Sequence, residues 1–321
     1  MKPKVYITRK LPDSVIEQLS KDCDVTMWGK EEEPVPRDIL ENEIRRVDGL
    51  LCMLTDTIDE DLMNRATHLK VVSNMAVGYN NIDIEAATKK GIMVTNTPGV
   101  LTETTADLTF ALMMATARRL IEASDFLREG KWQSWAPMQL TGQDVYGATL
   151  GIIGMGRIGE AVAKRAKGFD MKVLYANRSR KPKVEEELGV RYVDKVTLLQ
   201  KSDFVCVLVP YTPKTKNTID RKELALMKPT AILINTARGG VVNEGALYDA
   251  LVNQKIWAAG LDVFEEEPLS TDHPLLSLPN VVALPHIGSS SIRTRIKMAE
   301  LAATNIIEAV SGETPSCLVH K

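Results

Sequence analysis

Three side chains with complementary proton and charge chemistry stand near the ends of apolar runs in the second half of the chain. Arg238 follows AILINTA, Glu267 comes a few residues after AAGLDVF, and His286 ends NVVALPH. An arginine can grip a carboxylate in a fork and polarise the carbonyl beside it. A histidine can move a proton near neutral pH, and a hydrogen-bonded glutamate can orient its ring. Each residue alone is more often structural, but the three together suit a hydride transfer that also moves a hydroxyl proton.

A glycine-rich turn indicates the cofactor for such a reaction. In GIIGMGRIGEAVAKRA, Gly154, Gly156 and Gly159 stand between a strand-like run and a helical one. The first glycine can make the tight turn, the second can admit a pyrophosphate, and the third can let helix and strand pack closely. N–H groups at the helix start would bind the phosphates. The motif alone is weak, but this setting favours a dinucleotide site over a structural glycine turn.

The segment after the next strand indicates which dinucleotide is bound. An acidic residue there would bind both ribose hydroxyls and repel a 2′-phosphate. The sequence instead reads Asn177-Arg178-Ser179-Arg180. Asn177 removes that repulsion, and Arg178 and Arg180 supply charge-assisted donors. We therefore expect NADP(H), with NAD(H) as the alternative. The competing interpretation is a solvated basic loop that leads into the next helix.

The elements that must position these residues follow the pattern of parallel βα units. This pattern predicts an α/β fold with two doubly wound parallel-sheet domains, a Rossmann coenzyme domain and a smaller flavodoxin-like substrate domain. The first domain has the apolar runs KVYIT, GLLCML, LKVVSNM and IMVTN, and the second has ATLGIIG, MKVLYAN, DFVCVLVP, TAILINTA, AAGLDVF and NVVALPH. Because the carboxyl ends of parallel strands face the ligand crevice, we expect the three candidate residues along one edge.

Two helical patterns set the expected domain boundaries. Residues 102–130 read as one long helix that bridges the domains, with Thr104 and Asp107 spaced as a capping box and Leu108, Leu112 and Ala115 on one stripe. The last helix, within 289–312, is expected to return to the first domain. The prediction is a discontinuous substrate domain, 1–99 with 288–321, and an NAD(P)-binding domain, 100–287. Hinges for domain closure are expected near 97–103 and 284–290.

Composition gives no support to several classes of function. The 321 residues are 44% hydrophobic and 26% charged, with a net charge of −2. This balance provides no bulk attraction to nucleic acid or to an anionic membrane. No run reaches the roughly 20 apolar residues that a membrane span needs. We therefore expect neither nucleic acid nor membrane as a partner.

The cysteines and histidines indicate neither disulfides nor a metal site. The cysteines are far apart in sequence and form no C-x-x-C pair: Cys23, Cys52, Cys206 and Cys317. This pattern is typical of reduced thiols, and together with an N-terminus that has no apolar signal core it predicts a cytoplasmic protein. The histidines show no metal-ligand spacing: His68, His273, His286 and His320. No metal is expected.

Six motifs resemble, in order, the D-isomer-specific 2-hydroxyacid dehydrogenase family over nearly the whole chain. They are AVGYNNID (76–83), NTPGVLTETTAD (96–107), GIIGMGRIG, INTARGGVVNEGAL (234–247), AAGLDVFEEEPL (258–269) and LPHIGSSS (284–291). The resemblance implies that Arg238, Glu267 and His286 are catalytic and that the backbone N–H groups of Val77 and Gly78 bind the substrate carboxylate. It further implies reduction of small 2-keto acids, with His286 as general acid and base.

The same resemblance implies the remaining binding residues. Those for the cofactor are Thr105, Gly154, Gly156, Arg157, Ile158, Gly159, Asn177, Arg178, Ser179, Arg180, Pro210, Thr236, Ala237, Asp262, His286 and Gly288. Those for the substrate are Leu54, Val77, Gly78, Trp135, Arg238 and His286. Asn177 departs from the commoner NAD pattern of the family, in agreement with NADP(H).

Within the family, the sequence is similar to the glyoxylate reductase/hydroxypyruvate reductase branch. GKWQSWAPMQLTGQDVYG (130–147) resembles the dimer arm of those enzymes, in which a tryptophan matching Trp135 reaches the partner's active site. A homodimer is therefore expected, although Trp132 and Trp135 are equally interpretable as interface or core aromatics. Two alternatives stay open. One is another D-2-hydroxyacid dehydrogenase, such as a 2-ketogluconate enzyme; the other is a cofactor-sensing corepressor-like protein. Glu267 argues against formate dehydrogenase, which carries a glutamine there.

Overall fold

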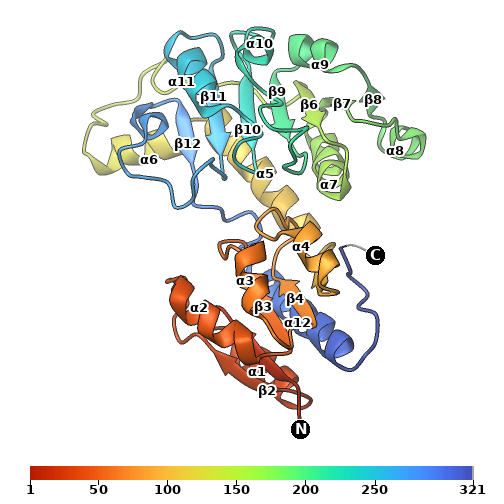
Figure 1. Ribbon diagram of the computed structural model, residues 1–321. Helices are drawn as coiled ribbons and strands as arrows, with labels where there is room; N and C mark the ends of the chain where they lie inside the picture. The colour runs from red at the N-terminus through yellow and green to blue at the C-terminus, as the bar shows by residue number, and fades with distance from the viewer. Residues whose placement is uncertain (320–321) are drawn as a thin grey trace. The chain divides into compact units, whose positions relative to one another are not determined.

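The computed structural model describes residues 1–319 and divides into two compact units. One unit comprises Met1–Leu101 with the segment from Ser290 onward, and the other comprises Thr102–Ser289. Each unit is built on a parallel sheet, so the predicted α/β class with two parallel-sheet domains is confirmed (Figure 1). His320, one of the four histidines considered as metal ligands, lies outside the described residues.

The first unit is a five-stranded sheet in the order β2-β1-β3-β4-β5, with all described pairs parallel. Its strands are β1 (Lys4–Ile7), β2 (Asp24–Met27), β3 (Gly49–Cys52), β4 (Val71–Asn74) and β5 (Met93–Thr95). Four of them coincide with the predicted apolar runs. The edge strand β2 was not predicted, because it leaves Asp24 and Thr26 exposed and forms no apolar run.

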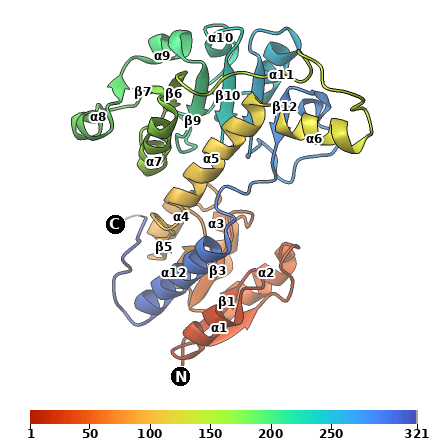
Figure 2. The same ribbon diagram turned by 180° about the vertical axis from the view of Figure 1, so that it is seen from behind.

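Helices cover both faces of this sheet. On one face α12 (Ile292–Val310) packs on β3, β4 and β5 beside α1 (Asp13–Ser20), and Figure 2 shows it crossing the sheet. Ala299, Ala302, Ala303 and Ile306 line its buried side at helical spacing. The opposite face is covered by α2 (Arg37–Glu43), the 3-10 turn η1 (Ile44–Arg46), α3 (Glu60–Arg65) and α4 (Ile84–Lys89).

The second unit is a seven-stranded sheet in the order β12-β11-β10-β9-β6-β7-β8, again with parallel pairs. Its strands are β6 (Thr149–Ile153), β7 (Lys172–Ala176), β8 (Arg191–Tyr192), β9 (Phe204–Val207), β10 (Ile232–Asn235), β11 (Ala258–Leu261) and β12 (Val281–Ala283). The direction of winding reverses between β6 and β9, which is where doubly wound sheets bind ligands. Only the short exposed edge strand β8 was not predicted.

Two helical layers enclose this sheet. One layer comprises α5 (Thr102–Ala117), α7 (Arg157–Ala166), the 3-10 turn η2 (Lys167–Phe169) and α8 (Pro182–Leu188) (Figure 2). The other comprises α9 (Lys195–Lys201), α10 (Arg221–Leu224) and α11 (Glu244–Val252). The remaining elements are α6 (Leu120–Arg128) and the 3-10 turn η3 (Pro274–Ser277).

The prediction of one continuous helix over 102–130 is wrong. The chain breaks between α5 and α6 at Arg119, whose φ of 53° is left-handed. The Ala117 carbonyl, which could continue the helix, instead accepts the N–H of Gln143 at 2.8 Å. A contact 26 residues away along the sequence thus ends α5.

The predicted capping box of this segment is also wrong, whereas the predicted apolar stripe lies on a buried or half-buried side of α5. Because α5 begins at Thr102, Thr104 and Asp107 lie inside the helix, and the Asp107 carboxylate accepts the Nε–H of Arg165 at 2.7 Å. Of the predicted stripe only Leu112 is buried, whereas Leu108 and Ala115 are half-buried.

The structure bears on the expected absence of membrane spans and on the state of the cysteines. Among residues 1–319, no helix is both long enough and apolar enough to cross a bilayer. All four cysteines are free thiols; Cys23, Cys52 and Cys206 are buried, and Cys317 is partly exposed.

Candidate active site

The glycine turn between β6 and α7 has the geometry that its sequence predicted. Gly154 has a φ of +103°, and a Cβ there would lie 2.7 Å from the Leu208 carbonyl oxygen. A Cβ at Gly159 would lie 2.4 Å from the Gly154 oxygen. Packing thus requires both glycines. At Gly156, the N-cap of α7, a Cβ would enter open space, so packing does not explain this glycine. The open surface beside the N–H groups of a helix fits a dinucleotide phosphate.

The loop after β7 holds the four residues expected to select the cofactor. Asn177 donates its side-chain amide to the Ser179 carbonyl at 2.9 Å. Arg180 binds Glu185 through two hydrogen bonds of 2.8 and 2.7 Å, and this bond pattern lowers the pKa of Glu185 to about 2. Arg178 is exposed and contacts no charged partner within residues 1–319. Arg178 is therefore available to an anionic ligand, whereas Arg180 is already paired.

His286 and Glu267 are brought together at the carboxyl edge of the second sheet. His286 Nδ1 lies 2.6 Å from Glu267 Oε2, and the Phe264 N–H donates to Glu267 Oε1 at 3.0 Å. Burial would raise the pKa of Glu267, but the hydrogen bond and charge of His286 with the charge of Arg238 outweigh it and hold the pKa below its usual value. An ionised Glu267 fixes the proton on Nδ1 and leaves Nε2 free to react.

The backbone of His286 is itself unusual. Its φ is 53°, in the left-handed region that non-glycine residues rarely occupy, and its N–H donates to the Leu284 carbonyl at 3.1 Å. The His286 side chain is 21% exposed, so its ring reaches solvent while its Nδ1 edge is held. Such conformations persist where the surrounding structure enforces them, commonly at functional sites.

Arg238 follows β10 and is fixed by a residue that sequence reasoning missed. Asn235, at the end of the strand and 2% exposed, donates to the Arg238 carbonyl at 3.0 Å and accepts the Ala237 N–H at 3.1 Å. The Arg238 guanidinium donates to the Ala237 carbonyl at 2.8 Å. Burial lowers the pKa of Arg238, opposed by the charge of Glu267, yet an arginine remains charged at neutral pH. Asn235 stands in the sequence INTAR (234–238), three residues before Arg238, but as an uncharged side chain it was not predicted as a site residue.

Asp262, after β11, is a buried carboxylate with one unsatisfied oxygen. It is 0% exposed; Oδ1 accepts the Ile287 N–H at 2.8 Å, while Oδ2 has no hydrogen-bond partner in the described chain. Burial raises the pKa of Asp262 to about 6, against the opposing effects of the Ile287 amide and the His286 charge. A Cβ at Gly288 would lie 3.2 Å from Oδ2 and 3.5 Å from Thr105 Cγ2. Thr105, Asp262 and Gly288 are thus neighbours, and an amide donor would satisfy the free oxygen.

The other expected cofactor residues lie at the same strand ends. Thr236 is buried and its hydroxyl lies 2.6 Å from that of Thr109 in α5. Ala237 precedes Arg238, and Pro210, after β9, is exposed. At the start of α7, Arg157 is exposed and Ile158 is half-buried. These positions follow the edge on which Gly154 and Asp262 also lie.

The expected substrate residues of the first unit lie in two loops. Leu54 follows β3 and is half-buried, and Val77 and Gly78 follow β4 and are half-buried as well. Trp135 belongs to the second unit, where it is 78% exposed in the segment after α6. The structure therefore excludes the interpretation of Trp135 as a core aromatic of its own chain.

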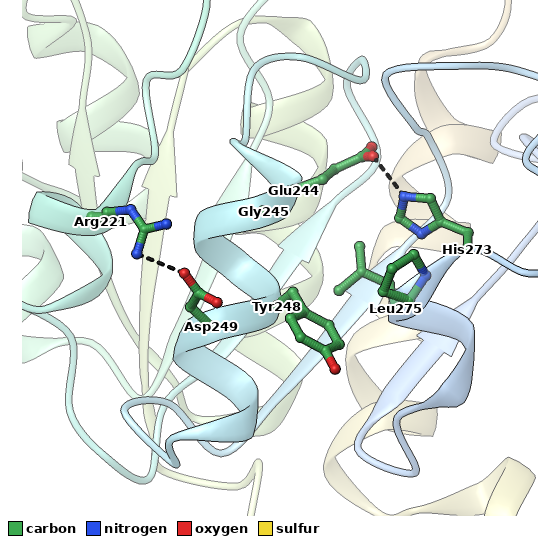
Figure 3. Close-up of a pocket in the computed structure, with 8 residues that line it drawn as sticks. Arg221, Glu244, Gly245, Tyr248, Asp249, His273 and Leu275 are labelled. Atoms are coloured by element: carbon green, nitrogen blue, oxygen red, sulfur yellow. Dashed lines mark ion pairs between the residues drawn. The ribbon is translucent and has the colours of Figure 1, made fainter.

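A separate pocket lies beside α11 and the turn that carries His273 (Figure 3). It has a volume of about 350 Å³ and is lined by Arg221, Glu244, Gly245, Tyr248, Asp249, His273, Pro274 and Leu275. Glu244 faces His273 at 3.3 Å and accepts the Glu265 N–H at 2.6 Å, while Arg221 pairs with Asp249. Glu244 thus joins the start of α11 to the segment two residues before Glu267.

Comparison with known proteins agrees with this geometry. Residues 110–288 match the family model described as D-isomer specific 2-hydroxyacid dehydrogenase, NAD binding domain. A glyoxylate reductase of Thermococcus litoralis is 52% identical, in an alignment covering 100% of this chain and 98% of the relative. This chain is a D-isomer specific 2-hydroxyacid dehydrogenase family member. The predicted family is confirmed.

Further relatives of this D-2-hydroxyacid dehydrogenase extend the comparison. A glyoxylate reductase of Korarchaeum cryptofilum is 51% identical over 100% of this chain and 97% of its own. A solved structure of the NADPH-dependent glyoxylate/hydroxypyruvate reductase of Sinorhizobium meliloti, in complex with NADP and malonate, superposes with a TM-score of 0.85. It is 34% identical, with coverage of 99% of this chain and 97% of that one. The protein is thus an oxidoreductase of the 2-hydroxyacid dehydrogenase class that uses a nicotinamide cofactor.

Proposed function

We propose that this dehydrogenase reduces the small 2-keto acids glyoxylate and hydroxypyruvate with NADPH to 2-hydroxy acids, the D isomer where the product is chiral. The observation that carries the proposal is the 2.6 Å hydrogen bond between His286 and Glu267 at the strand-end edge that also holds Arg238. The names of the relatives from Thermococcus litoralis and Sinorhizobium meliloti support the substrate class.

Each residue of this trio has a distinct role in the proposed reaction. A bound nicotinamide supplies the hydride. His286 gives the proton on Nε2 to the substrate oxygen as negative charge develops there, and Glu267 stabilises the imidazolium before that transfer. Arg238 grips the carboxylate and stabilises the developing charge on the adjacent oxygen. In the reverse direction His286 accepts the hydroxyl proton.

The proposed preference for NADPH rests on the loop after β7. Arg178 and Ser179 are the donors we assign to the 2′-phosphate, and Arg180 becomes a third only if its pairing with Glu185 is released. Asp262 Oδ2 is the acceptor we assign to the carboxamide of the nicotinamide. The S. meliloti reductase, which is named NADPH-dependent, supports this preference.

We also propose that the two units have different binding roles and that the protein forms a homodimer. The second unit binds the cofactor, and the first presents Leu54 and the N–H groups of Val77 and Gly78 to the substrate. The exposed apolar side chains of α6 and the segment after it form the dimer arm. They are Leu120, Ile121, Leu127, Trp132, Trp135 and Met138.

Initial rates of NADPH and NADH oxidation test the activity, with glyoxylate, hydroxypyruvate, pyruvate and 2-ketogluconate as substrates. Glyoxylate or hydroxypyruvate should be fastest, with NADPH. His286→Ala should lower kcat by about a hundredfold or more, because general acid catalysis contributes at that scale, while NADPH still binds. The exposed His68, changed to alanine, is the matched control and should leave kcat unchanged.

Three results would contradict the proposal. Faster oxidation of NADH would overturn the assignment of the Asn177–Arg180 loop. Near-normal turnover by His286→Ala would remove the histidine from the mechanism. Tight NADPH binding without turnover of any substrate would favour a cofactor-sensing protein.

A further inference from the structure

The loop after β4 carries peptide groups whose orientation is fixed by side-chain and backbone donors. The Ala76 carbonyl accepts the Thr97 N–H at 2.9 Å, and the Val77 carbonyl accepts Asn96 Nδ2 at 2.8 Å. In a trans peptide the N–H points opposite to the carbonyl of the preceding residue. Holding these two carbonyls therefore turns the N–H groups of Val77 and Gly78 away from the end of β5. Neither N–H donates a hydrogen bond to residues 1–319.

The next peptide of the loop is held by a buried asparagine. Asn74, which ends β4 and is 0% exposed, donates Nδ2 to the Gly78 carbonyl at 2.9 Å and to Asn81 Oδ1 at 3.2 Å. Its own Oδ1 faces the Cys52 thiol at 3.6 Å. The Asn74 amide is thus fully engaged, and its orientation is set by acceptors on one side and a donor on the other.

Asn81 connects this loop to the turn that carries Leu54. Its Nδ2 donates to the Met53 carbonyl at 3.1 Å and to the Asp56 carbonyl at 3.0 Å. The same turn is closed by the buried Asp56 carboxylate, which accepts the Met53 N–H at 2.7 Å and pairs with Arg9 at 3.6 Å. One half-buried amide therefore spans the two loops that we expect to face the substrate.

We propose that Asn74, Asn81 and Asn96 are positioning residues for 2-keto acid recognition. Asn96 holds the peptide between Val77 and Gly78, so that the Gly78 N–H stays available to a carboxylate beside the N–H of Val77. Asn74 holds the following peptide through the Gly78 carbonyl and so fixes the loop on the other side of this donor. Asn81 fixes the spacing between that pair of donors and Leu54, and thus which chain length fits beside the carboxylate. This inference rests on the proposed function, because it deepens how the same substrate class is bound.

Steady-state kinetics separate these roles from a structural one. Asn96→Ala should raise the KM of glyoxylate and of hydroxypyruvate by a similar factor of about tenfold, the scale of one lost hydrogen bond to a charged group. Asn81→Ala should change the two KM values by different factors, because it frees the Leu54 turn. In both variants kcat should fall less than KM rises, and the Kd of NADPH should stay unchanged. Asn80→Ala, an exposed neighbour without such contacts, is the control.

A ligand titration tests the peptide geometry without turnover. In the wild-type protein with NADPH bound, oxamate should shift the amide NMR signals of Val77 and Gly78, and Asn96→Ala should weaken the shift of Gly78 more than that of Val77, because Asn96 holds the peptide that carries the Gly78 N–H. Unchanged KM values with undiminished shifts in Asn96→Ala would overturn the proposal, as would an equal loss of kcat, NADPH binding and melting temperature. If the wild type reduced no 2-keto acid, the proposed function would fail, whereas the oxamate shifts would still decide whether these asparagines position the amides.

Discussion

At the scale of single residues, the ionisation of Asp262, which we expect to bind the cofactor, affects the stability of the fold. Its pKa is raised to about 6, so the folded protein binds this proton more tightly than the unfolded chain does. Relative to a variant with a neutral side chain at position 262, the free energy of unfolding is therefore maintained at low pH and falls as pH rises from about 4 to about 6. The charged carboxylate destabilises the cofactor-free fold above that range.

Asp262→Asn should be more stable than the wild type at pH 8, by roughly 2–3 kcal/mol before the cost of the new buried amide donor. The difference should shrink as pH falls through 6 toward 4. Melting temperatures of the cofactor-free proteins, measured from pH 4.5 to 8, check this, with the exposed Asp61→Asn as control. A difference that grows toward low pH would show that the sign is wrong.

Arg178 and Arg180 have the same charge but different surroundings. Because Arg180 is held by Glu185 and Arg178 is not, Arg178→Ala should raise the KM of NADPH by about tenfold or more and leave that of NADH nearly unchanged. Arg180→Ala should have the smaller effect. Parallel kinetics with both cofactors check this, and equal losses for NADPH and NADH would refute a role at the 2′-phosphate.

At the scale of elements, the turn after β10 and the segment after β11 are packed backbone against backbone. A Cβ at Gly239 would lie 1.7 Å from the Phe264 oxygen and 2.4 Å from the Glu265 nitrogen. Gly239→Ala must therefore displace the segment that carries Glu267.

Because that displacement moves Glu267 away from His286, Gly239→Ala should lower kcat by about a hundredfold, the scale of general acid–base catalysis, while NADPH still binds. Gly245→Ala is the matched control, since its Cβ would meet nothing nearer than Asn243 Oδ1 at 3.6 Å. Stopped-flow kinetics and cofactor fluorescence give the two readouts. Normal turnover by Gly239→Ala would mean that this contact does not position Glu267.

The same elements show what sequence reasoning can and cannot reach. Strand cores such as ILIN of β10 and the turn at Gly154 were predictable, because a buried strand requires apolar residues and a left-handed turn requires glycine. The end of α5 was not predictable, because the Ala117 carbonyl accepts the N–H of Gln143, which is distant in the sequence. The pairing of Arg180 with Glu185 and the amide network around Asn81 were missed for a similar reason. Partner choice depends on folded geometry, which residue type alone does not encode.

At the scale of the whole molecule, α6 combines exposed apolar side chains with the absence of any buried residue. Leu120, Ile121 and Leu127 are each at least half exposed, and Trp132 and Trp135 follow at 56% and 78% exposure. Several large apolar side chains exposed along one short segment of a folded chain are typical of protein interfaces. A second copy of the same chain would cover it in the proposed homodimer.

Leu127→Glu combined with Trp132→Ser should therefore convert a dimer into a monomer without unfolding the chain. Light scattering after gel filtration should give twice 35.5 kDa for the wild type and 35.5 kDa for the variant. Ile292→Glu, at a position 84% exposed in the first unit, is the control and should leave the dimer intact. If Trp135 also completes the partner's active site, the monomeric variant should lose kcat/KM for glyoxylate while its NADPH affinity persists. A monomeric wild type would refute the arm as an interface. A fully active monomeric variant would show that the arm serves dimer formation and that Trp135 does not complete the partner's active site.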